Sequence, residues 1–171
     1  NDPDNLNSIL AVVHAKLGHN FHFYKKNTII RRIKRRMSLK QQEALGDYVT
    51  YLRENPNEIK ALFKDLLIGV TGFFREKESW DLLGRIVLEQ LIEKKPNGKP
   101  VRVWVPACSS GEEAYTVSIL LHEKAASMKM HPRFQIFATD IDTNALEIAR
   151  IGRYPDSVAS TIPKDILTKY F

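Results

Sequence analysis

Residues 1–70 alternate between apolar and polar positions with the period of an α-helix. Apolar side chains recur every three to four residues along four segments, and Asn55-Pro56 separates the last two of them. No run with the two-residue period of a strand occurs before residue 100. The pattern therefore predicts a small all-helical unit, with helices over residues 6–17, 28–37, 41–54 and 57–68.

Turn and cap residues mark the ends of the first two predicted helices. Gly18 is a predicted C-cap, since glycine readily adopts the left-handed backbone conformation that ends many helices. Asn27 or Thr28 is the predicted N-cap of the second helix, because either side chain can accept a hydrogen bond from a free amide at a helix start.

A different pattern begins near residue 100. A predicted amphipathic helix over residues 77–94 and the loop KKPNGKP precede two short β-branched or aromatic runs, the first of which is typical of a buried strand. The second run ends at Asp140, and Thr143 is the predicted cap of the helix after it. This order predicts a βαβα unit with a parallel sheet, with strands at 101–105 and 134–139 and helices at 115–126 and 143–150.

The change of pattern predicts two domains. We place the boundary before the 77–94 helix, which gives a helical N-terminal domain at residues 1–76 and an α/β domain at residues 77–171. Strands alternating with helices are typical of sheets that bind ligands at the carboxyl ends of their strands. We therefore look for chemistry in the second domain.

Composition indicates a globular protein without a transmembrane helix. Hydrophobic residues make up 43% of the 171 residues and charged residues 27%, and no apolar run has the length of a transmembrane helix. The polar start NDPDNLNSIL has no signal-peptide core and no initiator Met, which suggests a piece of a larger protein. Cys108 is the only cysteine, so no disulfide forms within the chain and a cytoplasmic location is expected.

The net charge of +6 is concentrated in the N-terminal third, where no acidic residue occurs between Lys25 and Lys40. On a helical wheel the basic side chains of this segment gather opposite or beside its apolar side. Such a surface attracts an anionic partner: nucleic acid, an acidic protein surface or anionic lipid. The apolar side consists of Ile29, Ile30, Ile33 and Met37; the opposite side carries Arg31, Lys34 and Arg35, and Arg32 and Arg36 lie on the flank.

The loop ACSSGEE after the first strand is the strongest candidate for a ligand site. A small-residue loop between a parallel strand and a helix presents backbone amides to a ligand, and Gly111 permits a close approach. Asp140, at the end of the next strand, can accept hydrogen bonds from both hydroxyls of a ribose. Glu112 and Glu113 would repel a pyrophosphate, so an adenosine cofactor with a cationic centre and no phosphate, such as S-adenosylmethionine, fits better.

Each of these residues also has a purely structural interpretation. Gly111 can serve a turn alone, and Glu112 and Glu113 can stabilise the first turn of the following helix through its dipole. Asp140 can be a residue that only begins a helix. Residue types and spacing leave both interpretations open.

Three motifs in this order resemble those of CheR-type chemotaxis methyltransferases. ACSSGEEAY and FATDIDTNALEIAR resemble the family's signature, and the upstream TGFFRE, residues 71–76, resembles a third stretch. The helical start with its basic helix is similar to the family's N-terminal domain. The resemblance implies a small all-α domain followed by a Rossmann-like class I domain that binds S-adenosylmethionine.

The resemblance also implies roles for single residues. Asp140 would hold the ribose hydroxyls, Glu113 would contact the methionine part of the cofactor, and Arg75 would orient the incoming carboxylate. Gly69 stands two residues before Thr71, where the family's pattern predicts a polar Asn. The implied cofactor-binding set is Thr71, Arg75, Ala107, Cys108, Gly111, Glu113 and Asp140, with Arg75 also catalytic.

The implied activity is methylation of glutamate side chains on methyl-accepting chemotaxis receptors. A glutamate carboxylate is ionised at neutral pH and needs no general base to attack a sulfonium methyl group. The basic helix would dock onto the acidic receptor helices, and a solvated helix face is the other interpretation. Nucleic acid is disfavoured because no aromatic residue interleaves with the arginines. The docking residues implied are Arg31, Arg32, Arg35 and Arg36.

Three expectations limit this interpretation. The family's sheet has about seven strands and only two are predicted here, so we expect an incomplete, truncated α/β domain with exposed sheet edges, which favours oligomerisation or domain swapping. A non-catalytic module that docks acidic helical partners within a larger signalling protein is the alternative function. His14, His19 and His22 lack further ligands at suitable spacing, so no metal site is expected.

Overall fold

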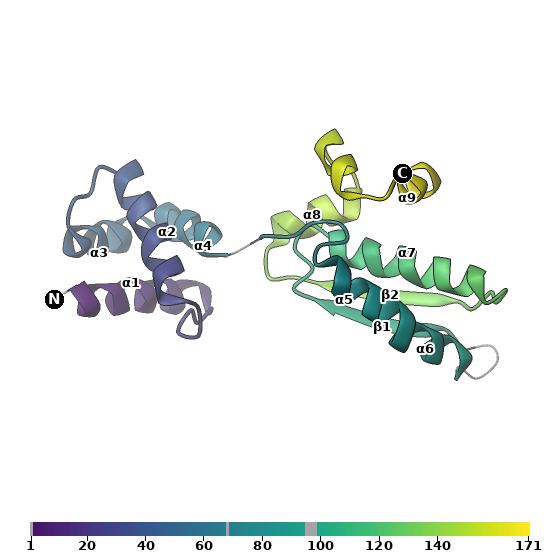
Figure 1. The fold of residues 1–171 in the computed structure, drawn as a ribbon. Helices are drawn as coiled ribbons and strands as arrows, with labels where there is room; N and C mark the ends of the chain where they lie inside the picture. Colours follow the sequence, from purple (N-terminus) through teal and green to yellow (C-terminus); the bar gives the residue numbers. More distant parts are fainter. Residues whose placement is uncertain (1, 68, 95–98) are drawn as a thin grey trace. The chain divides into compact units, whose positions relative to one another are not determined.

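The computed structural model describes residues 2–67, 69–94 and 99–171. Its contacts divide the chain into two compact units, residues 1–68 and residues 69–171, here called unit 1 and unit 2 (Figure 1). This division falls eight residues before the boundary predicted from the sequence, so the TGFFRE segment belongs to unit 2.

Unit 1 consists of helices packed around one apolar core. Helix α1 packs against α3 and α4, and α2 packs against α4. The apolar side predicted for the second helix faces this core: Ile29, Ile33 and Met37 are buried, and the partly buried Ile30 packs against the same core. The helices are α1 Asp2–Leu17, α2 Lys26–Leu39, α3 Leu45–Glu54 and α4 Pro56–Leu66.

The ends of the first two helices agree only in part with the prediction. Gly18 has a φ of 73°, and its amide donates to the carbonyl oxygen of His14 at 2.8 Å, as expected of a glycine after a helix. The predicted caps Asn27 and Thr28 are wrong. Helix α2 already begins at Lys26, and the carbonyl oxygen of Lys25 accepts the first helical hydrogen bonds without any side-chain cap.

Unit 2 contains two parallel strands, β1 Val101–Pro106 and β2 Phe134–Thr139, which form a two-stranded sheet (Figure 1). The predicted 77–94 helix is present as consecutive helical elements with a π-helical turn in the middle. Among the described residues the other helical elements follow the predicted order. The elements are α5 Lys77–Leu82, the π-helical η1 Leu83–Leu88, α6 Glu89–Glu93, α7 Glu112–Ser127, α8 Thr143–Ile151, the 3₁₀ turn η2 Asp156–Thr161 and α9 Lys164–Tyr170.

One face of the sheet is packed and the other is open. Leu88, Val117 and Leu121 pack with Val101 and its neighbours on alternate positions of the strands. The prediction of a buried strand at 101–105 holds for one face only, because in the described ranges helical side chains pack against that face alone. On the opposite face the side chains of Trp104 and Phe137 are 67% and 46% exposed.

Helix α8 begins with a side-chain cap, but not the predicted one. The carboxylate of Asp142 accepts hydrogen bonds from the amides of Asn144 and Ala145, while Thr143 is the first helical residue. No helix within the described residues is both long enough and apolar enough to span a bilayer.

Candidate functional site

The loop that follows β1 has a strained backbone. Ala107, Ser109 and Gly111 have φ angles of 55°, 47° and 98°. The amide of Cys108 donates to the carbonyl oxygen of Thr139 at 3.0 Å, which ties the loop to the end of β2. Non-glycine residues with positive φ are uncommon and gather at binding sites. The loop lies at the carboxyl ends of both strands, where open α/β sheets bind ligands.

Asp140 lies beside this loop with its carboxylate held in place by two backbone amides. Oδ2 accepts from the amide of Ser109 at 2.7 Å, and Oδ1 accepts from the amide of Asp142 at 2.7 Å. Each oxygen of a carboxylate has two acceptor positions, so both can still accept a ligand hydroxyl. The side chain is half-buried and therefore stays accessible.

The TGFFRE segment is attached to α7. The amide of Phe74 donates to Oγ1 of Thr116 at 3.2 Å, and Nη1 of Arg75 donates to the carbonyl oxygen of Val70 at 2.7 Å. Oγ1 of Thr71 is buried without a hydrogen-bond partner in the described part of unit 2. A buried hydroxyl normally has a partner, so this atom fits a site in which a ligand supplies one.

Gly69 also lies close to the loop. A Cβ atom at this position would come within 3.2 Å of Oγ of Ser109. The polar residue that the family's pattern predicts here would therefore require the Ser109 hydroxyl to shift slightly, by a few tenths of an ångström.

The sequence comparisons agree with this geometry. Residues 69–171 match the family described as "CheR methyltransferase, SAM binding domain", and residues 4–67 match "CheR methyltransferase, all-alpha domain". The chain belongs to the CheR methyltransferase family. The boundary between the two matched segments coincides with the boundary between unit 1 and unit 2.

Several curated proteins are similar to this CheR-family chain. A chemotaxis protein methyltransferase of Borreliella burgdorferi is 31% identical over 98% of this chain and 60% of its own length. Chemotaxis protein methyltransferase 2 of Pseudomonas aeruginosa is 33% identical over 86% of this chain and 50% of its own length. An uncharacterised 104.1 kDa protein of Rhodobacter capsulatus is 35% identical over 89% of this chain but only 16% of its own length. The chain thus spans about half the length of the chemotaxis methyltransferases that it matches.

Glu113 lies among charged groups of this site. Burial raises the pKa of its carboxyl above the usual value, the positive charge of Arg75 lowers it, and the negative charges of Glu112 and Asp140 raise it further. The net direction is upward. A cationic ligand beside Glu113 would stabilise the ionised carboxylate, which is the electrostatic condition that a sulfonium or ammonium group meets.

Cys108 is fully buried, and its environment opposes ionisation. Burial is the largest cause of a raised pKa for its thiol, and the nearby carboxylate of Asp140 raises it further. Because the thiolate is the reactive form, these surroundings do not activate Cys108 as a nucleophile.

Gly111 is needed for packing within unit 2. A Cβ at this position would lie 2.8 Å from Cβ of Ala149 on α8 and 3.2 Å from the hydroxyl of Tyr154. The hydroxyl of Tyr154 donates to the carbonyl oxygen of Ser110 at 2.7 Å, so a residue far along the chain supports the loop. The sequence analysis did not identify Tyr154, and no local motif points to it.

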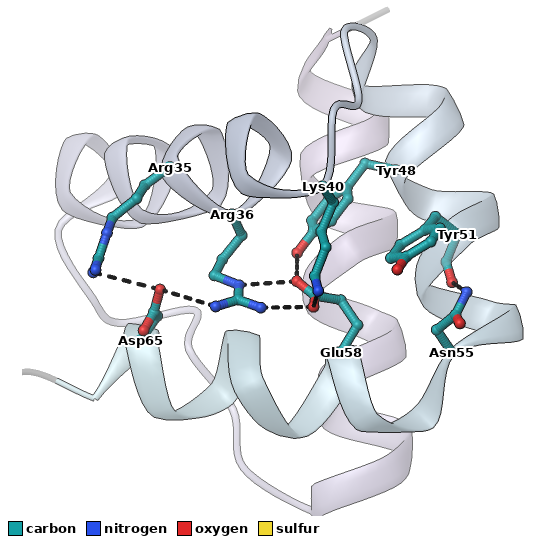
Figure 2. Close-up of polar contacts among 8 residues, drawn as sticks. All are labelled: Arg35, Arg36, Lys40, Tyr48, Tyr51, Asn55, Glu58 and Asp65. Carbon is teal, nitrogen blue, oxygen red and sulfur yellow. Dashed lines mark hydrogen bonds and ion pairs between the residues drawn. The ribbon is translucent and has the colours of Figure 1, made fainter.

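A buried ion pair joins the basic helix α2 to α4, as Figure 2 shows. Nε and Nη2 of Arg36 donate to the two carboxylate oxygens of Glu58 on α4, at 2.9 and 2.6 Å. The hydroxyl of Tyr48 donates to Oε1 of Glu58 at 2.8 Å. Burial raises the pKa of Glu58, but the hydrogen bonds from Arg36 and Tyr48 and the charges of Arg36 and Lys40 outweigh it, and the net pKa is below the usual value.

The predicted docking residues therefore differ in their surroundings. The side chain of Arg36, predicted on the flank of the basic side, is only 15% exposed and forms an ion pair with Glu58, so it is not a free docking residue. Arg35 is 61% exposed and lies 3.6 Å from Oδ2 of Asp65. Arg31 is exposed and Arg32 is half-buried.

Proposed function

We propose that this chain forms the receptor-docking and cofactor-binding parts of a protein-glutamate methyltransferase that uses S-adenosylmethionine and acts in the cytoplasm on chemoreceptor helices. Membership of the CheR family and the names of its relatives support methyl transfer in chemotaxis. The single observation that carries the proposal is the carboxylate of Asp140, oriented by two amides beside a loop of positive-φ residues.

The residues present fit the cofactor. Asp140 would accept hydrogen bonds from the ribose hydroxyls, and Glu113 would face the cationic part. The unpaired hydroxyl of Thr71 would donate to or accept from the ligand, and the exposed Ala107 would offer an apolar surface with the buried Cys108 beneath it. A pyrophosphate would meet two further negative charges here, so a dinucleotide fits less well.

The bound cofactor would supply a methyl group activated by the adjacent sulfonium. The protein's own contribution is positioning, since a substrate glutamate is already ionised at neutral pH. Arg75 is exposed, and its guanidinium donates to the carbonyl oxygen of Val70. Its positive charge acts on Glu113 and opposes the burial that raises the pKa of that carboxyl. We propose that Arg75 attracts and orients the incoming carboxylate.

Calorimetric titration with S-adenosylhomocysteine tests the cofactor proposal. We expect the wild-type chain to bind and Asp140→Asn to weaken binding at least tenfold, because the amide replaces one of two acceptor oxygens by a donor. Asp156→Asn, an exposed acid in η2, is the matched control and should bind normally. Equal affinity of Asp140→Asn and wild type would refute the assignment.

Arg75→Ala tests the orienting role. Transfer of labelled methyl groups to a receptor-helix fragment should fall, while the affinity for S-adenosylhomocysteine changes less than the rate. If both the affinity and the rate are unchanged, Arg75 has neither of the proposed roles.

A non-catalytic docking module is the second candidate function. The open face of the sheet, with Trp104 and Phe137 exposed, favours it because the cofactor domain is only half covered. In that case unit 1 would bind acidic helices with the same affinity in the presence and absence of S-adenosylhomocysteine, and no methyl transfer would be detected.

A further inference from the structure

The connection between α1 and α2 contains three aromatic residues with very different exposure. Phe21 is 2% exposed and belongs to the core of unit 1, and Tyr24 is packed against the same core. Phe23, between them, is 91% exposed. An aromatic ring exposed to water contributes no burial energy to the fold, so the stability of unit 1 does not explain why a phenylalanine occupies position 23.

The turn holds Phe23 outward rather than leaving it loose. The amide of Tyr24 donates to the carbonyl oxygen of Phe21 at 3.0 Å, and the ring centroids of these two residues lie 4.8 Å apart. The amide of His22 donates to Oδ1 of Asn20 at 2.8 Å. The backbone on both sides of Phe23, at His22 and Tyr24, is therefore held by hydrogen bonds. The ring of Phe23 lies beside the ring of His22, with their centroids 5.5 Å apart.

The surroundings of Phe23 are basic. Lys25 and Lys26 follow it after Tyr24 and are exposed, and α2 continues with the exposed Arg31. No acidic residue occurs between Asp4 and Glu43. An exposed aromatic side chain with polar neighbours matches the anatomy of protein-binding hot spots, in which an aromatic anchor at the centre is enclosed by a polar rim.

We propose that Phe23 is the apolar anchor of the docking surface of unit 1, and that it inserts between apolar side chains of an acidic, helical protein partner. Lys25 and Lys26 pair with carboxylates on either side of the insertion. This inference rests on the proposed docking function and adds to it a residue that determines affinity without carrying charge.

A protein helix fits this surface better than a lipid bilayer does. Amphipathic helices that bind membranes insert a continuous apolar face. The apolar face of α2 is buried inside unit 1, since Ile29, Ile33 and Met37 are each at most 6% exposed. A single projecting ring among cations suits a protein partner that has a small apolar pocket flanked by acidic side chains.

The proposal predicts two different responses to salt. Ionic contacts of Arg31 weaken as salt screens them, so the effect of Arg31→Ala shrinks at high salt. Burial of an apolar ring is not screened, so the effect of Phe23→Ser persists. Comparing the two variants separates the apolar anchor from the charged surface around it.

The probe is a fluorescently labelled synthetic amphipathic helix in which glutamates flank a stripe of alanine and leucine, titrated with the full chain. We expect Phe23→Ser to weaken binding about thirtyfold at both low and high salt, which is the smallest loss that counts as a hot-spot effect. Phe23→Trp should retain binding. Ile151→Ser, which removes a 65% exposed side chain on α8 in unit 2, is the control and should have no effect. Circular dichroism should show that all three variants remain folded.

The outcomes distinguish this inference from the function on which it rests. If the wild type binds the helix and Phe23→Ser binds equally well, the anchor is refuted and docking stands. If the wild type does not bind the helix at all, the docking function fails and the anchor with it. If Phe23 is required instead for binding vesicles of phosphatidylglycerol, the surface is a membrane contact and the proposal is overturned.

Discussion

Unit 1 buries its apolar side chains more completely than unit 2 does. The shorter unit 1 closes a core in which Ile9, Ile33 and Leu62 have no exposed surface. Unit 2 packs one face of its sheet and leaves Trp104 and Phe137 exposed on the other. Helices can cover one another in a small bundle, whereas a parallel sheet needs a layer on each face. We infer that unit 1 is the more stable of the two.

The same contrast applies to charged groups. Unit 1 buries the Arg36–Glu58 pair with its hydrogen bonds satisfied. Unit 2 keeps Glu113 and Asp140 half-buried around a strained loop. Both tryptophans, Trp80 and Trp104, are in unit 2, so their fluorescence follows unit 2 alone, while circular dichroism follows both units.

The largest effect should come from breaking the buried ion pair. Arg36→Met leaves Glu58 buried without its main partner, and we expect unit 1 to lose about 3–5 kcal/mol of unfolding free energy. The measurement is urea unfolding followed by circular dichroism, with the tryptophan transition unchanged. The matched control is Arg35→Met, which removes a 61% exposed arginine and should cost less than about 1 kcal/mol. Equal losses for the two variants would mean that the buried Arg36–Glu58 pair stabilises unit 1 no more than an exposed arginine does.

A core truncation should have a similar but somewhat smaller effect. Ile33→Ala creates a cavity in unit 1, and we expect a loss of about 2–4 kcal/mol. Ile148→Ala removes the same atoms from a 47% exposed position on α8 and should change the stability of unit 2 by less than about 0.5 kcal/mol. A large loss for Ile148→Ala would show that α8 is buried more deeply than the structure indicates.

The cap of α8 offers a smaller effect confined to unit 2. Asp142→Ala removes the acceptor of two helix-start amides and should destabilise unit 2 by about 1 kcal/mol. Thr143→Ala, at the predicted cap, should have little effect. The midpoint of the tryptophan transition measures the stability of both variants. A larger loss for Thr143→Ala than for Asp142→Ala would restore Thr143 as the cap.

The most gradual change should come from pH. The pKa of Glu58 in the folded unit is below its usual value of 4.5, so its contribution to stability is complete above that pH. The contribution is lost as the pH falls from 4.5 through the lower folded pKa. The stability difference between wild type and Glu58→Gln should therefore shrink over this range. A difference that stays constant with pH would contradict the pKa direction.

The sequence was sufficient to predict the order of the helices and strands and the presence of Asp140 directly after the second strand, because both depend on short-range patterns. The strand–loop–helix order and the position of Asp140 at the end of β2 follow from periodicity and motif. The choice between Asp142 and Thr143 as a cap depends on backbone angles, since both residue types can cap a helix.

Long-range contacts could not be predicted. The helical wheel placed Arg36 on a flank, but its burial depends on Glu58 from another helix, 22 residues away in the chain. Tyr154 supports the loop from 44 residues away through Ser110. The burial of β1 depends on which helices lie against each face of the sheet, which the composition of the strand alone does not encode.

The most direct test of the account is whether the cofactor site lies entirely in unit 2. The chain is unfolded in urea with and without S-adenosylhomocysteine, and tryptophan fluorescence and circular dichroism are recorded together. At a ligand concentration one hundred times the Kd, we predict that the tryptophan transition gains about 2.7 kcal/mol while the transition of unit 1 does not move. A shift of both transitions, or of neither, would contradict the account.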